Sequence, residues 1–232
     1  AGHSLGEHSA LVAAGALSFK DAVYAVRKRG EFMNEAVPAG EGAMAAILGM
    51  DSQALKEVTD KVSEEGNLVQ LANLNCPGQI VISGTAKGVE LASELAKEKG
   101  AKRAIPLEVS GPFHSELMKP AADKLREVLD ACKISDAAIP VVSNVTADFV
   151  TDKDDIKNKL IEQLYSPVRF EETISRLIDE GVTTFIEIGP GKVLSGLVKK
   201  VNRRVKTIAV SDPNTIELAV QTLKEENENA GK

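Results

Sequence analysis

Ser4 is the residue of this sequence best placed to act as a nucleophile. It stands between two glycines in Gly2-His3-Ser4-Leu5-Gly6, which matches the G-x-S-x-G pattern of a nucleophile elbow. In an elbow the serine lies on a sharp turn between a strand and a helix, and both flanking glycines are expected to be needed so that the two elements can approach. The N–H groups that begin the helix can then stabilise an oxyanion. The alternative is a serine that only caps the helix.

The elbow motif needs a strand before it, and only Ala1 precedes it in this sequence. The sequence also lacks an initiator Met and a basic-then-apolar signal pattern at its beginning. We therefore expect that further residues once preceded Ala1.

A serine nucleophile needs a general base, and the sequence contains three histidines. His3 precedes the serine in the turn, so its side chain is expected to point away from the hydroxyl. His8 comes one helical turn after Ser4 and is predicted to be an ordinary surface or partly buried helix residue. His114 lies in a Gly-Pro loop between two predicted units, where it could face a cleft. A purely structural role for His114 is the alternative.

An arginine could hold an anionic substrate beside the serine. Arg27, Lys28 and Arg29 come together in a predicted helix that begins near Ser18. Such a run is usually a solvated charged face. The functional alternative is one buried guanidinium that grips a carboxylate with two hydrogen bonds. Periodicity does not choose between Arg27 and Arg29.

The elements that would position these residues form two units. Residues 42–110 follow the order strand, helix, strand, strand, helix, strand, which is the ferredoxin-like arrangement. Residues 1–41 and 111–224 alternate helices with strands, including strands at 139–144, 184–188 and 206–210. This alternation favours a parallel sheet flanked by helices. Residues 225–232 are predicted to be a frayed polar tail.

Composition excludes several classes of protein. The 232 residues carry a formal net charge of −6, which disfavours non-specific binding to nucleic acid. No segment has the roughly 20 apolar residues of a membrane-spanning helix. The two cysteines, Cys76 and Cys132, are too few for a disulfide framework, and no Cys/His cluster has zinc spacing. The sequence thus predicts two thiols in a reducing cytoplasm, and no metal site.

Six ordered motifs together resemble one family. They are Gly-His-Ser-Leu-Gly-Glu at 2–7, Val-Arg-Lys-Arg-Gly at 26–30, Gly-Ala-Met-Ala-Ala at 42–46, Asn-Cys-Pro-Gly-Gln at 75–79, Gly-Pro-Phe-His-Ser at 111–115 and Ile-Gly-Pro-Gly-Lys-Val-Leu at 188–194. The sequence is similar to the malonyl-CoA:acyl carrier protein transacylases of bacterial type II fatty acid synthesis. The resemblance implies an α/β-hydrolase-like large domain that is interrupted by the ferredoxin-like subdomain.

The resemblance also implies roles for particular residues. Ser4 would be the acylated nucleophile, His114 its base, and Arg29 the partner of the malonyl carboxylate. The backbone carbonyl of Gln163 would orient the histidine, and the N–H of Leu5 would supply half of the oxyanion hole. The other half comes, in the family, from an N-terminal loop of the form G-Q-G-S-Q, which this sequence does not contain.

The implied reaction moves a malonyl group from malonyl-CoA to the phosphopantetheine thiol of acyl carrier protein, without a cofactor. Phe113, beside the histidine, would crowd the malonyl α-carbon and disfavour a branched methylmalonyl unit. Because the carrier proteins are acidic, a basic stretch is a candidate docking patch: Lys199, Lys200, Arg203 and Arg204. The alternative for this patch is a solvated helix end. A monomeric cytoplasmic enzyme is expected.

Two other functions compete with this one. A general serine hydrolase or thioesterase shares the elbow, but usually places its histidine late, after the acidic member. Here no histidine follows His114. The second competitor is an inactive fragment that only binds carrier protein.

Overall fold

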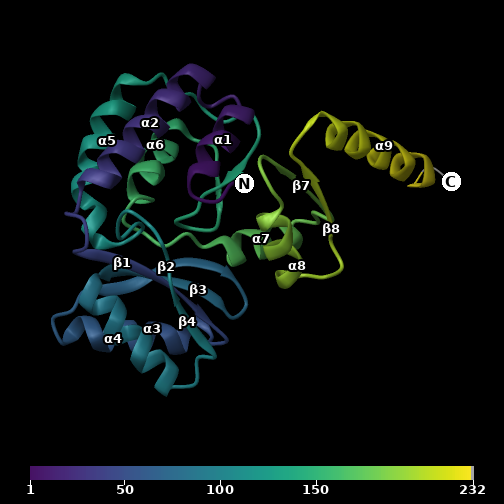
Figure 1. Ribbon diagram of the computed structural model, residues 1–232. Coiled ribbons are helices and arrows are strands. Elements are labelled where there is room, and N and C mark those ends of the chain that lie inside the picture. The colour runs from purple at the N-terminus through teal and green to yellow at the C-terminus, as the bar shows by residue number, and fades with distance from the viewer. Residues whose placement is uncertain (231–232) are drawn as a thin grey trace. The chain divides into compact units, whose positions relative to one another are not determined.

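The computed structural model describes residues 1–230 (Figure 1). They divide into two compact units, with the boundary between Thr173 and Ile174. Each unit is described by itself below. Among the helices of residues 1–230, none has the length and apolar composition needed to cross a lipid bilayer.

One part of the first unit is a layer of helices around an apolar core. The helices are α1 (Leu5–Ala13), α2 (Phe19–Glu35), α5 (Lys119–Ala131) and α6 (Lys153–Glu162). A short 3₁₀ helix, η1 (Glu116–Met118), precedes α5. Their shared core includes Leu11, Leu125 and Leu160, each at most 1% exposed. Helix α1 begins at Leu5, directly after the serine.

The other part of the first unit is a four-stranded sheet. Its elements are β1 (Gly42–Leu48), α3 (Ser52–Glu64), β2 (Val69–Cys76), β3 (Gln79–Thr85), α4 (Ala86–Glu98) and β4 (Arg103–Pro106). The strand order is β2-β3-β1-β4, and all neighbouring strands are antiparallel. The predicted element order is confirmed.

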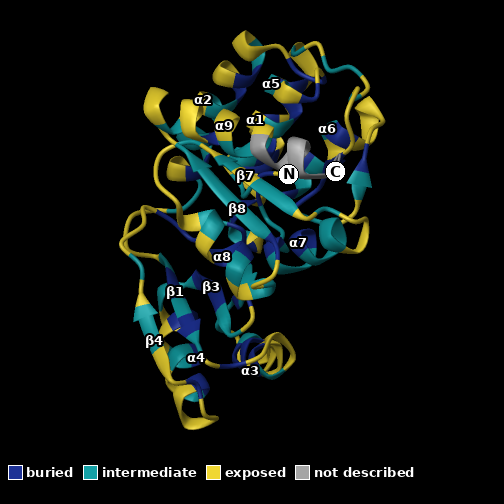
Figure 2. Cartoon of the chain, turned by 90° about the vertical axis from the view of Figure 1, so that its right-hand side faces the viewer, coloured by how far each residue is buried: buried dark blue, intermediate teal, exposed yellow. Residues whose placement is uncertain are grey.

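Strand alternation gives this sheet two different faces. Ala45 and Ile47 of β1 share an apolar cluster with residues of α3 and α4, which cover one face (Figure 1). Met44 points the other way and packs with Ala72, Val81 and Phe113. Buried residues run along β1 and β3, the two central strands (Figure 2). The sheet therefore has a second apolar face, and the loop of His114 packs against it through Phe113.

The strand predicted at 139–144 is much shorter in the structure. Only β5 (Val141–Val142) is a strand, and it pairs antiparallel with β6 (Phe149–Val150). The turn between them includes Ala147, with a φ of 54°. Close hairpin pairing takes the place of the predicted parallel pairing in this segment. Helix α7 (Phe170–Asp179) follows α6 and passes from the first unit into the second.

The second unit contains the parallel pairing that the sequence predicts. Strands β7 (Thr184–Ile188) and β8 (Lys206–Val210) pair in parallel and are joined through α8 (Val193–Val201). The Glu187 carboxylate accepts hydrogen bonds from the N–H groups of Leu194 and Ser195, which fixes the start of α8. Among residues 1–230, the predicted parallel sheet is limited to this pair of strands.

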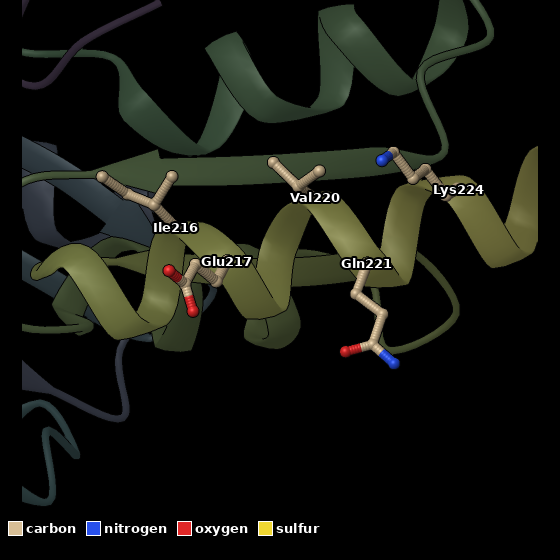
Figure 3. A pocket seen from close by; sticks show the side chains of 5 residues that line it. All are labelled: Ile216, Glu217, Val220, Gln221 and Lys224. Carbon is tan, nitrogen blue, oxygen red and sulfur yellow. The ribbon is translucent and has the colours of Figure 1, made fainter.

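The last helix, α9 (Pro213–Ala230), differs from the predicted polar tail. The backbone is helical as far as residue 230, while Gly231 and Lys232 lie outside the described residues. Ile216, Val220 and Lys224 lie along one side of α9, and Glu217 and Gln221 point away from them (Figure 3). Ile216 is 51% exposed and Val220 46%. This helix does not contribute to the site described next.

Candidate active site

The side chains of Ser4 and His114 are in hydrogen-bond contact. Ser4 Oγ lies 2.9 Å from His114 Nε2, although the two residues are 110 positions apart. His114 Nδ1 lies 2.8 Å from the backbone oxygen of Gln163. Because a carbonyl only accepts hydrogen bonds, Nδ1 carries the proton and Nε2 presents its lone pair to the serine. This geometry fits a histidine that is ready to accept the hydroxyl proton.

Both residues adopt backbone conformations that are rare outside glycine. Ser4 has a φ of 50° and His114 a φ of 58°. Such conformations cost on the order of 1–3 kcal/mol each and persist where the surrounding structure holds them. Here the elbow turns the hydroxyl of Ser4 to the start of α1, and the loop after β4 turns the imidazole toward it. The N–H of Leu5 lies in the first turn of α1, where intrahelical acceptors are lacking.

The backbone at Gly2 lies so close to the backbone at Gly6 that one of the two elbow glycines is required. A Cβ on Gly2 would lie 2.0 Å from the carbonyl carbon and oxygen of Gly6, which leaves no room for a side chain. A Cβ on Gly6 would meet no atom of the described residues within 4 Å. The expectation that both glycines are needed for close approach is confirmed for Gly2. It is wrong for Gly6 in this structure, because a side chain at that position would meet no neighbouring atom.

We expect Gly2→Ala to lower the free energy of unfolding by at least the ~1–3 kcal/mol typical of overpacked sites. The matched control, Gly6→Ala, should leave stability unchanged or raise it by about 0.5–1 kcal/mol, because alanine is the better helix former. Urea denaturation of the two variants measures both effects. Equal losses in the two variants would contradict the steric argument.

Arg29 is the arginine that lies at the site. It shares the inner face of α2 with Ala22, Ala25 and Met33 and is 6% exposed. Its Nη2 donates hydrogen bonds to Ser4 Oγ at 2.8 Å and to Gln163 Oε1 at 2.9 Å. Nε is buried and has no acceptor among the described residues. Burial lowers the pKa of Arg29 to about 10, although nearby Glu7 opposes the shift, so the guanidinium remains charged at neutral pH.

Arg27 lies on the opposite, solvent-facing side of α2. Its side chain is 77% exposed, and its Nε is 2.7 Å from Glu31 Oε1. The structure thus resolves the choice that periodicity leaves open between the two arginines.

The side chain of Asn144 forms hydrogen bonds with the backbone of the elbow. The sequence analysis assigns no role to this residue. Its Oδ1 accepts a hydrogen bond from Ser4 N at 2.7 Å, and its Nδ2 donates one to Gly2 O at 2.6 Å. The residue is completely buried. Its position at the end of the predicted strand 139–144 is the one sequence signal that points to it. These two hydrogen bonds, to Ser4 N and Gly2 O, hold the backbone that leads into the strained serine.

Gln163, which follows α6 directly, joins the site through its side chain as well as its backbone. The predicted contact of its carbonyl with His114 is present. In addition, Nε2 donates to Glu7 Oε2 at 2.8 Å, to Ser4 O at 3.1 Å and to Asn144 Oδ1 at 3.2 Å. Sequence reasoning missed these side-chain contacts and Glu7 itself, which stands next to the elbow motif. Gln163 therefore connects the base, the arginine and the elbow.

The other two histidines do not contact Ser4 Oγ. His3 Nε2 is 2.8 Å from Asn75 Oδ1, and its ring packs 5.3 Å from that of Phe170, so it points away from the hydroxyl as predicted. His8 is 1% exposed, which corrects the prediction of a surface or partly buried residue. It lies on the inner face of α1 with Glu7 and Leu11. Burial and the nearby charge of Arg29 lower the pKa of His8 to about 3.

Buried titratable groups should make the stability of the fold depend on pH. Burial and the charge of Arg29 lower the pKa of His114 to about 3, as for His8, against 6.5 in an unfolded chain. Between these values the unfolded chain binds protons that the folded chain does not, so acidification below pH 6.5 destabilises the fold by about 1.4 kcal/mol per pH unit for each histidine. Burial raises the pKa of Glu7 from 4.5 to about 7, which opposes one histidine in that interval.

We expect the net loss between about pH 6 and 5 to be at least that of one histidine, because burial also lowers the pKa of His3. His8→Leu should reduce the slope by about 1.4 kcal/mol per pH unit, because the contribution of His8 is removed. Urea unfolding at several pH values measures the slope. A variant with the slope of the parent chain would show that His8 is not the group that titrates on unfolding.

The remaining predicted residues lie outside this network. Phe113, on the loop that carries His114, packs against two apolar clusters of the first unit: the core of the helical layer and the cluster of Met44, Ala72 and Val81. Lys199, Lys200, Arg203 and Arg204 belong to α8 and the turn after it, in the second unit. Lys199 Nζ donates to Val205 O at 2.6 Å and to Arg203 O at 3.4 Å, so this lysine closes the C-terminal end of α8.

Comparisons with known proteins agree with the chemistry of the site. The model of the acyl transferase domain matches residues 1–229. The malonyl CoA-acyl carrier protein transacylase of Bacillus subtilis (strain 168) is 88% identical over 99% of this chain and 73% of its own length. That of Staphylococcus aureus (strain MRSA252) is 52% identical over 90% of this chain and 68% of its own.

Solved structures agree with the fold. The crystal structure of malonyl CoA-acyl carrier protein transacylase from Clostridium perfringens superposes with a TM-score of 0.95 at 44% identity, over 99% of this chain and 72% of that one. A malonyl-transacylase in complex with its type II PKS acyl-carrier protein superposes with a TM-score of 0.92, also at 44% identity, over 95% of this chain and 71% of that one.

Proposed function

The chain belongs to the malonyl-CoA:acyl carrier protein transacylases of the acyl transferase family, and we propose that it moves malonyl groups through an ester on Ser4. The donor is malonyl-CoA, and the acceptor is the phosphopantetheine thiol of acyl carrier protein, for fatty acid biosynthesis. The observation that carries the proposal is the contact of Ser4 Oγ with both His114 Nε2 and Arg29 Nη2. A base and a cation for the substrate carboxylate thus meet at one hydroxyl.

In the first half of the reaction, Ser4 Oγ attacks the thioester carbonyl while His114 Nε2 takes the hydroxyl proton. The N–H of Leu5 at the start of α1 donates to the oxyanion of the tetrahedral intermediate. The carbon–sulfur bond then breaks, and the departing thiolate of coenzyme A takes the proton from His114. The product is O-malonyl-serine. Because the pKa of His114 is lowered by burial, its imidazole is neutral and able to accept a proton at physiological pH.

In the second half, the phosphopantetheine thiol attacks the ester and gives its proton to His114. The carbon–oxygen bond to Ser4 breaks, and the serine oxygen recovers its proton from the same imidazole. No cofactor is required, because proton transfer and oxyanion stabilisation suffice for acyl exchange between an oxygen and a sulfur.

Arg29 is proposed to bind the malonyl carboxylate. Burying that carboxylate without a partner would be costly, and a guanidinium can bind it with two parallel hydrogen bonds. The buried Nε, which has no acceptor among the described residues, provides one N–H for this purpose. Nη2 provides a second one on the same edge of the guanidinium when it releases its hydrogen bond to Ser4 Oγ, while its bond to Gln163 Oε1 is kept.

Mass spectrometry of the intact protein tests this proposal. Incubation with malonyl-CoA alone should leave a malonyl adduct, and peptide analysis should place it on Ser4. Addition of the thiol form of acyl carrier protein should then remove the adduct and malonylate the carrier. Free malonate as the main product would favour a hydrolase or thioesterase. Carrier binding without an adduct would favour the inactive fragment.

The partner of His114 favours transfer within this family over a hydrolase with a Ser-Asp/Glu-His triad. In such a hydrolase a carboxylate orients the histidine. Here the acceptor at Nδ1 is the neutral carbonyl of Gln163. The solved complex of a malonyl-transacylase with its acyl-carrier protein supports a carrier protein as the acceptor. The reaction is proposed to run in the cytoplasm. It is also proposed to run in a monomer, since Ser4, His114 and Arg29 meet within one chain.

We also propose the finer description of the fold. The large domain, residues 1–41 and 111–224, is α/β-hydrolase-like, and residues 42–110 are a ferredoxin-like subdomain. The strand order β2-β3-β1-β4 with both helices on one face supports the subdomain. Separate apolar clusters for the helical layer and for the sheet support the division within the first unit.

Phe113 is proposed to disfavour branched acyl units. It precedes the catalytic histidine and is wedged between two apolar clusters, so its ring has little freedom to withdraw from a methyl group on the malonyl α-carbon. One methyl is worth about 1–3 kcal/mol in such a pocket, so the selection against methylmalonyl should be modest.

The basic patch of the second unit is proposed to dock the acidic carrier protein. Lys200, Arg203 and Arg204 are exposed. Lys199 should be left intact in a test, because it closes α8. Reversing the other three charges to glutamate should raise the KM for carrier protein and leave acylation by malonyl-CoA unchanged. The matched control reverses the charges of three exposed lysines in the region 42–110: Lys61, Lys97 and Lys99. An equal rise of KM in both variants would contradict a local docking patch.

A further inference from the structure

Glu7 is a buried carboxylate that the proposed mechanism does not use. It lies in the first turn of α1 and is 1% exposed. Acidic side chains near a helix start are usually exposed and interact with the helix dipole. A buried carboxylate is costly unless hydrogen bonds and a positive charge compensate it. Its contacts therefore indicate what the carboxylate stabilises.

The Glu7 carboxylate receives hydrogen bonds from two sides. Oε2 accepts from the backbone N–H of Asn144 at 3.0 Å and from Gln163 Nε2 at 2.8 Å. Burial raises the pKa of Glu7 to about 7, so above that pH the carboxylate is ionised and accepts hydrogen bonds without donating any. Gln163 Nε2 also donates to Ser4 O and Asn144 Oδ1, and Glu7 is the one charged acceptor of the three. Its charge therefore favours the NH₂ end of the Gln163 amide at this position, and the oxygen end points the other way.

The oxygen end of that amide points to Arg29. Gln163 Oε1 accepts from Arg29 Nη2 at 2.9 Å, and the same nitrogen donates to Ser4 Oγ. A flipped amide would place its NH₂ group against the guanidinium, where two donors would face each other. The amide thus lies between an anion and a cation with its dipole aligned to both. Glu7 and Arg29 interact through Gln163, and not as a direct ion pair.

We propose that Glu7 is a positioning residue for malonyl transfer, because its negative charge fixes the orientation of the Gln163 amide, which in turn holds Arg29 beside Ser4. This inference rests on the proposed function. It extends that function to a residue that contacts neither the substrate nor the reacting atoms. The backbone carbonyl of Gln163 also receives His114 Nδ1, so one residue connects the carboxylate to both halves of the site.

A purely structural role is the alternative, in which Glu7 only anchors Asn144 and the elbow. Glu7→Gln separates the two roles. Both hydrogen bonds of Glu7 end on the same oxygen, so the amide oxygen of a glutamine can accept both. The anchor is then kept, but the negative charge is lost, and with it the electrostatic preference for the NH₂ end of Gln163 at Glu7 and the oxygen end at Arg29.

The test compares malonyl-CoA with acetyl-CoA as donors in single-turnover acylation of Ser4. We expect Glu7→Gln to lower kcat/KM for malonyl by about 10- to 100-fold, the size expected for weakened hydrogen bonds to a charged group. Acetyl transfer, which does not need Arg29, should change by less than about threefold. The melting temperature should stay close to that of the parent. The matched control is Glu31→Gln, an exposed acid on α2 that pairs with Arg27 and Lys28.

Combination with Arg29→Ala provides a second measurement. If Glu7 acts through the guanidinium, Glu7→Gln should not change the malonyl-to-acetyl ratio further in that background. Equal losses for both donors, or an unchanged ratio, would overturn the proposal and favour the structural role. If the parent chain forms neither acetyl-serine nor malonyl-serine, the proposed function itself is wrong. If only the Glu7 proposal fails, the parent chain still acylates Ser4, so the two failures are distinguishable.

Discussion

Replacing His114 with alanine should slow malonyl transfer to Ser4 by about 10²- to 10⁴-fold, the range expected for loss of a general base. The reason is geometric. His114 Nε2 is 2.9 Å from the serine oxygen, and Nδ1 is held by the Gln163 carbonyl, so no rotation is needed before the proton moves. Pre-steady-state formation of the malonyl adduct, followed by rapid quenching, measures this step directly.

The matched control is His3→Ala. His3 is the neighbour of Ser4 in sequence, but its ring contacts Asn75 and Phe170. Its removal should cost much less activity than the removal of His114. Comparable losses in the two variants would show that the elbow, and not the base, is affected. A His114→Ala variant that keeps nearly full activity would remove the basis of the proposed mechanism.

Arg29→Ala should reduce kcat/KM for malonyl-CoA by roughly 10²- to 10³-fold, since a buried carboxylate loses its partner. Acetyl transfer should fall by less than about tenfold, because only the hydrogen bonds to Ser4 Oγ and Gln163 Oε1 are lost. The variant should therefore change donor preference more than it changes overall activity. Competition between the two donors in one reaction gives the ratio without separate kinetic constants.

Arg27→Ala is the control for Arg29, since the two arginines are two positions apart on the same helix. Arg27 is exposed and pairs with Glu31 on the surface, and such pairs contribute about 0–1 kcal/mol to stability. Its loss should leave donor preference unchanged. If Arg29→Ala kept the preference for malonyl, the assignment of Arg29 as the carboxylate partner would be wrong.

The order of strands and helices in residues 42–110 could be predicted from sequence, because the patterns that indicate each element are local. Strand alternation, helical spacing and turn residues between 75 and 78 give the element order correctly. The segment 139–144 shows the opposite case. Its apolar residues are typical of a buried strand, but the actual pairing depends on Phe149 and Val150 of β6, which follow the turn. Pairing partners are set by tertiary contacts, which an apolar run does not encode.

For the active site, sequence predicted the residues that belong to a motif and missed those that act from a distance. Ser4 and His114 stand in recognisable turns. Asn144 carries no such signature, and Glu7 ends the motif at 2–7 without an assigned role, since the roles of both arise from contacts between residues more than 130 positions apart. The choice of Arg29 over Arg27 from the residues alone required knowledge of which face of α2 is buried. The burial of His8 was missed for the same reason on α1.

The wide spacing of the site along the chain has a consequence for the order of events during synthesis. Ser4 is joined to His114, Asn144 and Gln163 across 110, 140 and 159 residues. A ribosome makes the serine first and the glutamine last, and contacts that close such long loops form late in folding. The nascent hydroxyl consequently has neither its imidazole nor the amide that holds the guanidinium. We therefore expect an unfinished polypeptide to be a poor substrate for acylation at Ser4.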